Sequence, residues 1–387
     1  MTGRRGATKR IAAIALAVTA TAVATGPVTG AAPSAGHGYA SIAFTRDDTL
    51  DTHVTDPFDP PGATALVGDF AGDTTAQGRL DDILWYTPGS GGDALWRTRG
   101  DRSWAEVNVS VNGRYTPLVG RFSGDGKEDV FWYAPGSTPD VLWDFEVDGT
   151  ITQTTYTVSG TYTPVVGHFS SDDGDDIVWY APGRGADSWW DFDGHGRVAK
   201  RSLTVNGTYT PVVGSFSGIG APTNDTAQDI LWYGKGSVAD SIWDFNGDGA
   251  ATAKRGISIG GSYTPVPGDF SHDGFTDVIW YTPGSGPDSM WNFTNTSGAH
   301  TTIPLSINGT YTPVTGELFE QDGHQTDVLW FGAGGSRDVI WDFTAGTTPT
   351  SRDLTLVGDQ TPVLGVFERQ VVGGTTRQGA DILDRHT

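Results

Sequence analysis

Residues 268–281 read GDFSHDGFTDVIWY and contain two short motifs that recur along the chain. The first motif is Gly-x-Phe. The second is an Asp followed by an apolar run that ends in Trp and a further aromatic residue, which predicts a short buried β-strand. The first motif recurs, at steps of 47 to 54 residues, at Gly68, Gly120, Gly167, Gly214, Gly268, Gly316 (with one extra residue) and Gly365.

Each of the first six repeats contains four predicted strands. The second motif starts at Asp82, Asp129, Asp176, Asp229, Asp277 and Asp327, and a third motif ends in Trp96, Trp143, Trp190, Trp243, Trp291 and Trp341. A Thr-rich stretch with alternating polarity then leads to the next repeat. Four-stranded units of this length are typical of β-propeller blades, and middle strands that are apolar on both faces fit sheets covered by neighbours on each side.

The two ends of the chain decide the number of blades. The last repeat has only its first two strands before Thr387, whereas residues 39–44 align with the third strand of other repeats. We therefore predict an all-β, seven-bladed β-propeller of four-stranded antiparallel blades over residues 39–387, closed by pairing of the N- and C-terminal strands. The alternative is a six-bladed ring with residues 39–61 as a loose arm.

The first 32 residues have the pattern of an export signal and a small-residue spacer. Four cations precede an apolar run from Ile11 to about Ala24, with cleavage expected near residue 24 or 32. An uncleaved anchor is the alternative, but the run is shorter than the ~20 residues that a membrane span needs. We expect a secreted, extracellular, monomeric protein without a stable membrane span.

The charge of the chain excludes one class of partner. The formal net charge is −22, and it becomes −26 when the four leader cations are removed. Such an acidic protein is not expected to bind nucleic acid, because phosphate contacts require positive charge. The chain has no cysteine, so its stability comes without disulfides.

Residues 268–281 resemble the FG-GAP-like (VCBS) repeat family, and the resemblance extends over about residues 64–383. It implies a propeller similar to the integrin alpha-chain head and to calcium-containing propeller lectins, with Ca²⁺ as the bound ion. The residues agree, because oxygen donors at alternate positions around a Gly suit Ca²⁺. Asp269, Ser271, Asp273 and Asp277 would bind through their side chains, and Phe275 through its carbonyl.

Two further loops of equal length are weaker candidates for Ca²⁺. They offer Asp125 with Asp129 and Asp172 with Asp176, but Arg121 or His168 replaces the first ligand. The alternative is that Asp and Gly serve only as turn formers. Acidic residues after the third-strand Trp, such as Asp191 and Asp193, indicate a hairpin turn instead of a metal site.

The repeated tryptophans allow a carbohydrate-binding hypothesis. Indole rings stack on sugars, and they also fill the wedge between blades as core residues. The candidate ligand platforms at the two recurring positions are Trp132, Trp143, Trp179, Trp190, Trp232, Trp243, Trp280 and Trp291.

The sequence predicts a binding module and not an enzyme. It contains no nucleophile elbow, zinc-protease motif, cysteine nucleophile or phosphate-binding loop. We expect recognition of an extracellular glycan or cell-wall polymer through repeated blade sites with calcium-stabilised loops. The alternatives are a scaffold for a cell-surface protein and a propeller enzyme that cleaves polysaccharides or peptides.

Overall fold

The structure is a computed structural model, and it shows strands joined by turns. It describes residues 39–44, 50–55, 62–71, 80–99, 103–146, 150–194, 197–216, 227–245, 251–294, 298–318, 326–332, 336–343, 346–356, 360–367, 370–372, 375–377 and 381–385. The chain divides into two units, Met1–Ala35 and Gly36–Thr387, and every described residue belongs to the second. The predicted export signal therefore lies outside the described residues. In the described part of the chain, no helix is long and apolar enough to cross a membrane.

In the described residues, six four-stranded antiparallel sheets each use strands that follow one another in the chain, and we number them blades 1 to 6. Blade 1 contains β3 (Thr64–Gly68), β4 (Asp82–Tyr86), β5 (Asp93–Thr98) and β6 (Trp104–Val109). Blade 2 contains β7 (Thr116–Gly120), β8 (Asp129–Tyr133), β9 (Asp140–Phe145) and β10 (Ile151–Tyr156). Blade 3 contains β11 (Thr163–Gly167), β12 (Asp176–Tyr180), β13 (Asp187–Phe192) and β14 (Val198–Leu203).

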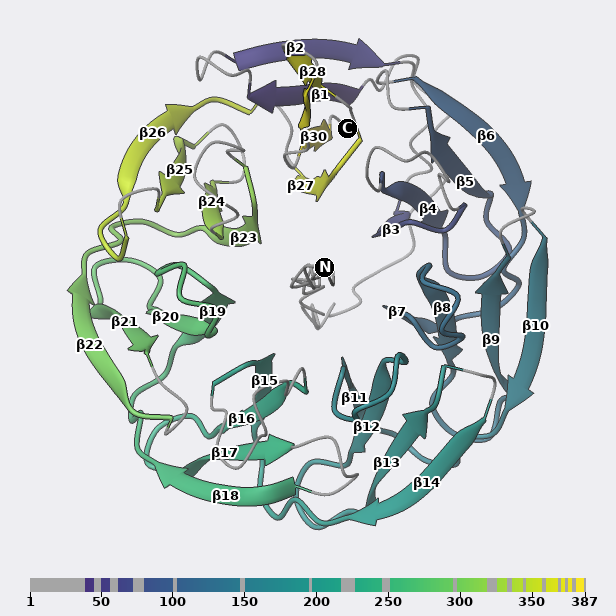
Figure 1. The fold of residues 1–387 in the computed structure, drawn as a ribbon, viewed down its shortest axis with the longest axis horizontal. Coiled ribbons are helices and arrows are strands. Elements are labelled where there is room, and N and C mark those ends of the chain that lie inside the picture. Colours follow the sequence, from purple (N-terminus) through teal and green to yellow (C-terminus); the bar gives the residue numbers. More distant parts are fainter. Residues whose placement is uncertain are drawn as a thin grey trace, which may run out of the picture. The chain divides into compact units, whose positions relative to one another are not determined.

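The other three blades repeat this order. Blade 4 contains β15 (Thr210–Gly214), β16 (Asp229–Tyr233), β17 (Asp240–Phe245) and β18 (Ala251–Ile257). Blade 5 contains β19 (Thr264–Gly268), β20 (Asp277–Tyr281), β21 (Asp288–Phe293) and β22 (His300–Leu305). Blade 6 contains β23 (Thr312–Gly316), β24 (Asp327–Phe331), β25 (Asp338–Asp342) and β26 (Thr350–Leu354). In Figure 1 the first strand of each blade lies inside and the fourth strand outside. The predicted β-propeller of four-stranded antiparallel blades is confirmed.

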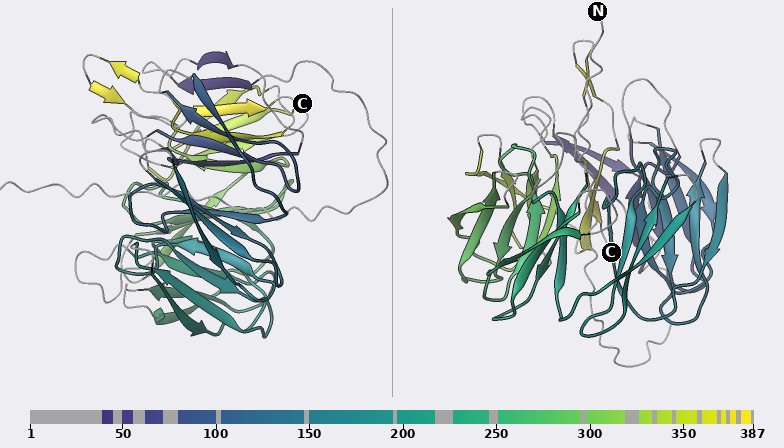
Figure 2. Two further views of the ribbon diagram at one scale, coloured as in Figure 1. Left: turned by 90° about the vertical axis from the view of Figure 1, so that its right-hand side faces the viewer. Right: turned by 60° about the horizontal axis from the view of Figure 1, so that its bottom comes forward.

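One further sheet combines strands from both ends of the chain. This composite sheet has the order β2 (Leu50–Thr55), β1 (Tyr39–Phe44), β30 (Asp381–Arg385) and β27 (Gln360–Gly365). The backbone of Ile42 lies opposite that of Ile382. The structure thus has six blades of consecutive strands where the sequence predicted seven, and a count of seven depends on the composite sheet acting as a blade. A separate hairpin, β28 (Gln370–Val372) and β29 (Thr375–Arg377), projects from the sheets in Figure 2.

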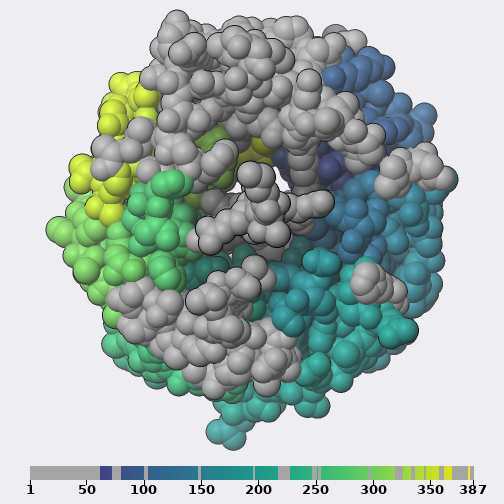
Figure 3. Space-filling model, in the orientation of Figure 1, coloured from purple at the N-terminus to yellow at the C-terminus, as the bar shows by residue number. Residues whose placement is uncertain are grey.

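The hydrophobic core lies between neighbouring blades. Every residue of the second strands β4, β8, β12, β16, β20 and β24 is buried. At the junction of blades 1 and 2, Phe70 and Tyr86 form one apolar cluster with Trp132 and Phe145. Figure 3 shows the described side chains of blades 2 and 3 in continuous contact. Because each buried aromatic ring removes about 150–250 Å² of surface from water, these junctions supply the main stabilising contact.

The composite sheet shares apolar clusters with two blades. Ile382 belongs to the cluster of blade 6, which also contains Leu329 and Phe331. Leu383 and Phe367 belong to the cluster of blade 1, which also contains Trp85. Adjacent residues of β30 therefore face different neighbours, as expected from the alternation of side chains along a strand.

A two-point hydrogen-bonded clasp recurs at the junctions. The Arg121 N–H donates to Asp175 Oδ2 at 2.9 Å, and the Arg121 carbonyl accepts the Asp175 N–H at 2.8 Å. Each clasp joins the residue after the first strand to the residue before the second strand of the next blade. The equivalent pairs are Asp69 with Glu128, His168 with Gln228, Ser215 with Thr276, Asp269 with Thr326, and Val366 with Asp81.

Candidate functional site

The Asp that begins each second strand is a structural acceptor. Asp277 is fully buried; its Oδ2 accepts the N–H groups of Phe270 at 3.1 Å and Ser271 at 3.0 Å, and its Oδ1 accepts the N–H of Phe293 at 2.9 Å. The side chain thereby ties the loop after the first strand to the end of the third strand. Asp129 and Asp176 make the same kind of contacts.

Burial makes these carboxylates hard to ionise without a cation. Burial above all, together with the neighbouring Asp191 and Asp172 carboxylates, raises the pKa of Asp176 to about 8 against the backbone hydrogen bonds that lower it. Burial likewise raises the pKa of Asp129 to about 7 and that of Asp277 to about 8. A positive charge beside such a group would favour its ionised form.

Among the described residues, a group of three acidic side chains that could hold a metal ion lies in blade 3. One oxygen from each of Asp172, Asp176 and Asp191 lies within 4.8 Å of the other two. The Ser170 hydroxyl donates to Asp172 Oδ1 at 2.8 Å, and Arg201 contacts Asp191 Oδ2 at 3.2 Å. Ca²⁺ binds oxygen at about 2.3–2.6 Å, so oxygens up to about 5 Å apart can share one ion. The donor set therefore fits Ca²⁺.

Asp191 is the functional candidate that the sequence interpretation missed. It was assigned to a hairpin turn, but it lies at the end of the third strand β13, beside the loop that carries Asp172. A signal for it exists, because an Asp or Asn follows the third-strand Trp at Asp144, Asp191, Asp244, Asn292 and Asp342.

Blade 5, the strongest candidate in the sequence, stabilises its loop by internal hydrogen bonds. Asp269 accepts the N–H groups of Asp273 at 3.1 Å and Gly274 at 2.9 Å, and Asp273 accepts that of Phe275 at 3.0 Å. The Asp269 and Asp273 charges lie close enough to Asp277 to raise its pKa. The structure brings the predicted carboxylates into one loop, but Asn292 replaces the acid that Asp191 supplies in blade 3.

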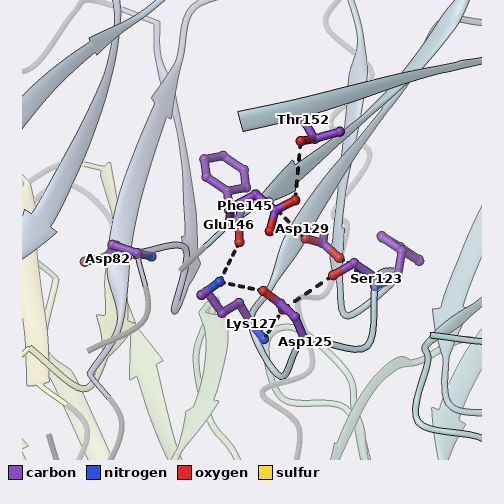
Figure 4. A network of polar contacts seen from close by, with 10 residues as sticks. Asp82, Ser123, Asp125, Lys127, Asp129, Phe145, Glu146 and Thr152 are labelled. Carbon is purple, nitrogen blue, oxygen red and sulfur yellow. Dashed lines mark hydrogen bonds and ion pairs between the residues drawn. The ribbon is translucent and has the colours of Figure 1, made fainter. Parts of the chain in front are cut away.

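Blade 2 already contains a positive charge beside one of its predicted ligands, Asp125. The buried Lys127 ammonium contacts Asp125 Oδ2 at 2.5 Å and donates to the Phe145 carbonyl at 2.8 Å. Asp129 accepts the Ser123 N–H at 2.8 Å nearby (Figure 4). The prediction of Asp125 and Asp129 as Ca²⁺ ligands overlooked Lys127, which neutralises Asp125 directly.

The predicted tryptophan platforms are core residues. Trp132, Trp179, Trp232 and Trp280 are 0–1% exposed, and Trp143, Trp190, Trp243 and Trp291 are 5–7% exposed. The two rows meet edge to face at centroid distances of 5.4–5.5 Å. A sugar needs an exposed ring face, so the burial of these eight side chains favours the packing alternative over ligand platforms.

Lysine and histidine side chains lie against three of the four third-strand tryptophans, Trp190, Trp243 and Trp291. The ammonium groups of Lys200 and Lys254 each lie 3.5 Å from the ring centre of Trp190 and Trp243. The His300 ring stacks on Trp291 at 3.8 Å. These contacts occupy ring faces that a ligand would otherwise use.

Half-buried tyrosines recur at five blade junctions. In the pair of blades 2 and 3, the Tyr162 N–H donates to the Tyr133 hydroxyl at 2.9 Å, and that hydroxyl donates to the Gly160 carbonyl at 3.1 Å. A Cβ at Gly160 would lie 2.7 Å from the Tyr162 ring, so this position, at φ 141°, suits only glycine. The five equivalent tyrosines are Tyr115, Tyr162, Tyr209, Tyr263 and Tyr311.

The tyrosines and the carboxylate groups lie at opposite edges of the blades. In an antiparallel blade, the loop after the first strand shares an edge with the turn after the third strand. The other edge holds the turn after the second strand and the connection to the next blade. Gly183 and Gly207 bridge these last two segments, next to Tyr209. We call this edge the junction face.

Comparisons with known proteins identify no family. No family model and no curated protein matches the chain, so membership of the FG-GAP-like family stays a prediction. A protein from Lactobacillus plantarum aligns with TM-score 0.49 and 15% identity over 84% of this chain and 97% of its own. The Photorhabdus luminescens Tc holotoxin pore aligns with TM-score 0.38 and 11% identity over 89% of this chain and 16% of its own. The V. cholerae biofilm matrix protein Bap1 aligns with TM-score 0.26 and 13% identity over 84% of this chain and 67% of its own. The propeller assignment rests on the strand pairing described above.

Proposed function

We propose that the protein is an exported, non-catalytic binding module that recognises an extracellular carbohydrate polymer through its junction face. The observation that carries this proposal is the row of five equivalent, half-buried tyrosines. Tyrosine offers a sugar both an apolar ring and a hydroxyl. Equivalent sites at successive junctions suit a ligand that itself repeats, because several weak contacts then act together.

The chemistry beside the tyrosines favours a neutral ligand. The residue before each tyrosine is exposed and is an uncharged hydroxyl side chain at four of five junctions, namely Thr161, Thr208, Ser262 and Thr310. Arg114 is the exception. Hydroxyl groups exchange hydrogen bonds with the hydroxyls of a polysaccharide and provide no charge to attract an anion.

We further propose that blade 3 binds one Ca²⁺ through Asp172, Asp176, Asp191 and Ser170. When bound, the ion would supply the positive charge that three close carboxylates need. Asp172 belongs to the loop after β11 and Asp191 to the end of β13, so their shared ligand would fix this loop to the third strand. The Asp269 loop of blade 5 is the second candidate, with the residues predicted from the sequence.

We also propose that the composite sheet acts as the seventh blade and closes the ring. Three observations support this proposal. Leu383 and Ile382 pack in clusters with blades 1 and 6, and the clasp between Val366 and Asp81 repeats that of the other junctions.

Retention on polysaccharides tests the proposed ligand. The mature protein is applied to insoluble glycans and cell-wall polymers, and the Tyr162→Ala, Tyr209→Ala double variant is compared with a Thr154→Ala control on the exposed strand β10. We expect the double variant to lose retention and the control to keep it. Equal retention of both variants, or no retention of the unaltered protein on any glycan, contradicts the proposal.

A protein-interaction scaffold is the second candidate function. The β28–β29 hairpin favours it, because this hairpin departs from the repeat and projects from the blades (Figure 2). Under this alternative, deletion of residues 370–377 would abolish binding to a cell surface, whereas the tyrosine double variant would bind normally.

A further inference from the structure

Lys127 occupies an unusual place for a lysine. Its side chain is 5% exposed, and its ammonium lies between the Asp125 carboxylate and the Phe145 carbonyl (Figure 4). A buried ammonium is unfavourable unless oxygen atoms replace its lost water. Here the oxygens come from the loop after β7 and from the end of β9, the two segments that carry Asp172 and Asp191 in blade 3.

The surroundings of Lys127 match the carboxylate group of blade 3 residue by residue. Ser123, Asp125, Asp129 and Asp144 occupy the positions of Ser170, Asp172, Asp176 and Asp191. Among the described residues, Asp144 Oδ1 is buried without a hydrogen-bond donor. Burial, together with the Glu146 and Asp125 carboxylates, raises the pKa of Asp144, and the Lys127 charge acts against this shift. The Lys127 charge therefore interacts with both Asp125 and Asp144.

Blade 3 has no room for such a side chain. Gly174 stands at the position of Lys127, and a Cβ on it would collide with the Phe192 carbonyl, the counterpart of the Phe145 carbonyl. The two blades thus share a group of acids, but only blade 2 provides a positive charge from the residue two places before its second-strand Asp.

We propose that Lys127 is a tethered cation that fills, in blade 2, the position that blade 3 leaves to a metal ion. The comparison rests on the Ca²⁺ site proposed for blade 3. Blade 2 is then stable without a metal ion. The Lys127 ammonium occupies the position at which a divalent cation would bind, so this blade excludes such cations. The ammonium resembles a bound ion in charge and in its oxygen contacts, but it cannot dissociate.

Exchange of the tethered cation for a free one tests the proposal. Three variants of the full mature chain are compared by thermal unfolding in chelator and in calcium chloride: Lys127→Gly, Lys127→Met and, as an exposed control, Lys235→Gly. In chelator, we expect both Lys127 variants to unfold about 5–10 °C lower than the unaltered protein, because acids lose a buried partner. Calcium should restore Lys127→Gly and not Lys127→Met, whose side chain still fills the space.

Calcium stoichiometry by equilibrium dialysis provides the second measurement. We expect Lys127→Gly to bind one more ion than the unaltered protein. Two results overturn the proposal. One is a Lys127→Met variant that is as stable as the unaltered protein. The other is a destabilised Lys127→Gly variant that binds no additional calcium and is not stabilised by it. If Lys127→Gly folds only with calcium, the proposal is supported.

The same experiment separates this inference from the Ca²⁺ site of blade 3. If the unaltered protein binds no calcium but Lys127→Gly binds one ion, the blade 3 site is wrong and the tethered cation stands. If the unaltered protein binds calcium through Asp191 but Lys127→Gly gains no ion, only the tethered cation is wrong.

Discussion

The backbone N–H of Val366 donates to Asp81 Oδ2 at 2.9 Å, and the Asp81 N–H returns a hydrogen bond to the Val366 carbonyl at 2.8 Å. These residues lie 285 positions apart, yet they form the same clasp that joins blades next to each other in the chain. The C-terminal segment is thereby attached to the start of blade 1.

Removal of the Asp81 acceptor should weaken this attachment. We expect Asp81→Ala to lower the free energy of unfolding by about 1–3 kcal/mol, because the Val366 N–H loses its partner. Asp81→Asn keeps an acceptor oxygen and should retain most of the stability. Chemical denaturation measures both, and equal stability of the two variants would show that the hydrogen bond contributes nothing.

The hydrogen bonds of the tyrosine hydroxyls inside the junctions should contribute a similar free energy of unfolding. Tyr133→Phe removes the group that accepts the Tyr162 N–H, with an expected cost of about 1–3 kcal/mol. Hydrogen exchange of the Tyr162 amide should become faster, while amides of the junction between blades 4 and 5 keep their rates. Blade 6 has Phe331 at this position, so the loss should not prevent folding.

Trp243→Ala should lower the stability of the fold and should not selectively weaken ligand binding. The ring is 7% exposed and packs against Trp232, so its removal is expected to cost about 3–5 kcal/mol. Thermal unfolding and glycan retention are measured together. A variant with unchanged stability but lost retention would restore the tryptophan-platform hypothesis.

The calcium affinity of blade 3 should depend on Asp191. We expect Asp191→Asn to weaken binding about tenfold or more, which equals ~1.4 kcal/mol, because ligand charge sets the affinity of such sites. Asp173→Asn, an exposed acid in the same loop, serves as the control. Calorimetric titration with calcium chloride compares the two, and identical affinities would exclude Asp191 as a ligand.

His300 should make stability depend on pH. Burial against Trp291 lowers the pKa of this imidazole, so the unfolded chain binds a proton more readily than the folded one. Its contribution is complete above the ordinary histidine pKa near 6.5 and is lost as the pH falls through the lowered folded value. The difference in unfolding temperature between the unaltered protein and His300→Gln should therefore change between pH 7.5 and pH 5. A constant difference would contradict this.

The sequence predicted the blade because its signals repeat. The buried Asp-apolar-Trp run defines each second strand, and even the pairing of residues 39–44 with the C-terminal strand was expected from the incomplete last repeat. The site was less predictable. Asp191 lies at the end of the third strand and Asp172 in the loop after the first strand, so only the fold brings them together. The role of Lys127 depends on where its ammonium lies. The sequence could not assign the tryptophans, because tryptophan serves both in hydrophobic cores and as a sugar-binding platform. Only the burial of each side chain in the fold separates these two roles.

The core of this protein belongs to pairs of blades and never to one blade. A single excised repeat would therefore expose both of its apolar faces and could not fold by itself. A gain or loss of core strands is tolerated only as a whole repeat, because a partial repeat leaves the apolar face of one blade without its counterpart. The number of blades in such a chain can evolve by duplication of complete repeats, while the loops at either edge diverge without altering the architecture.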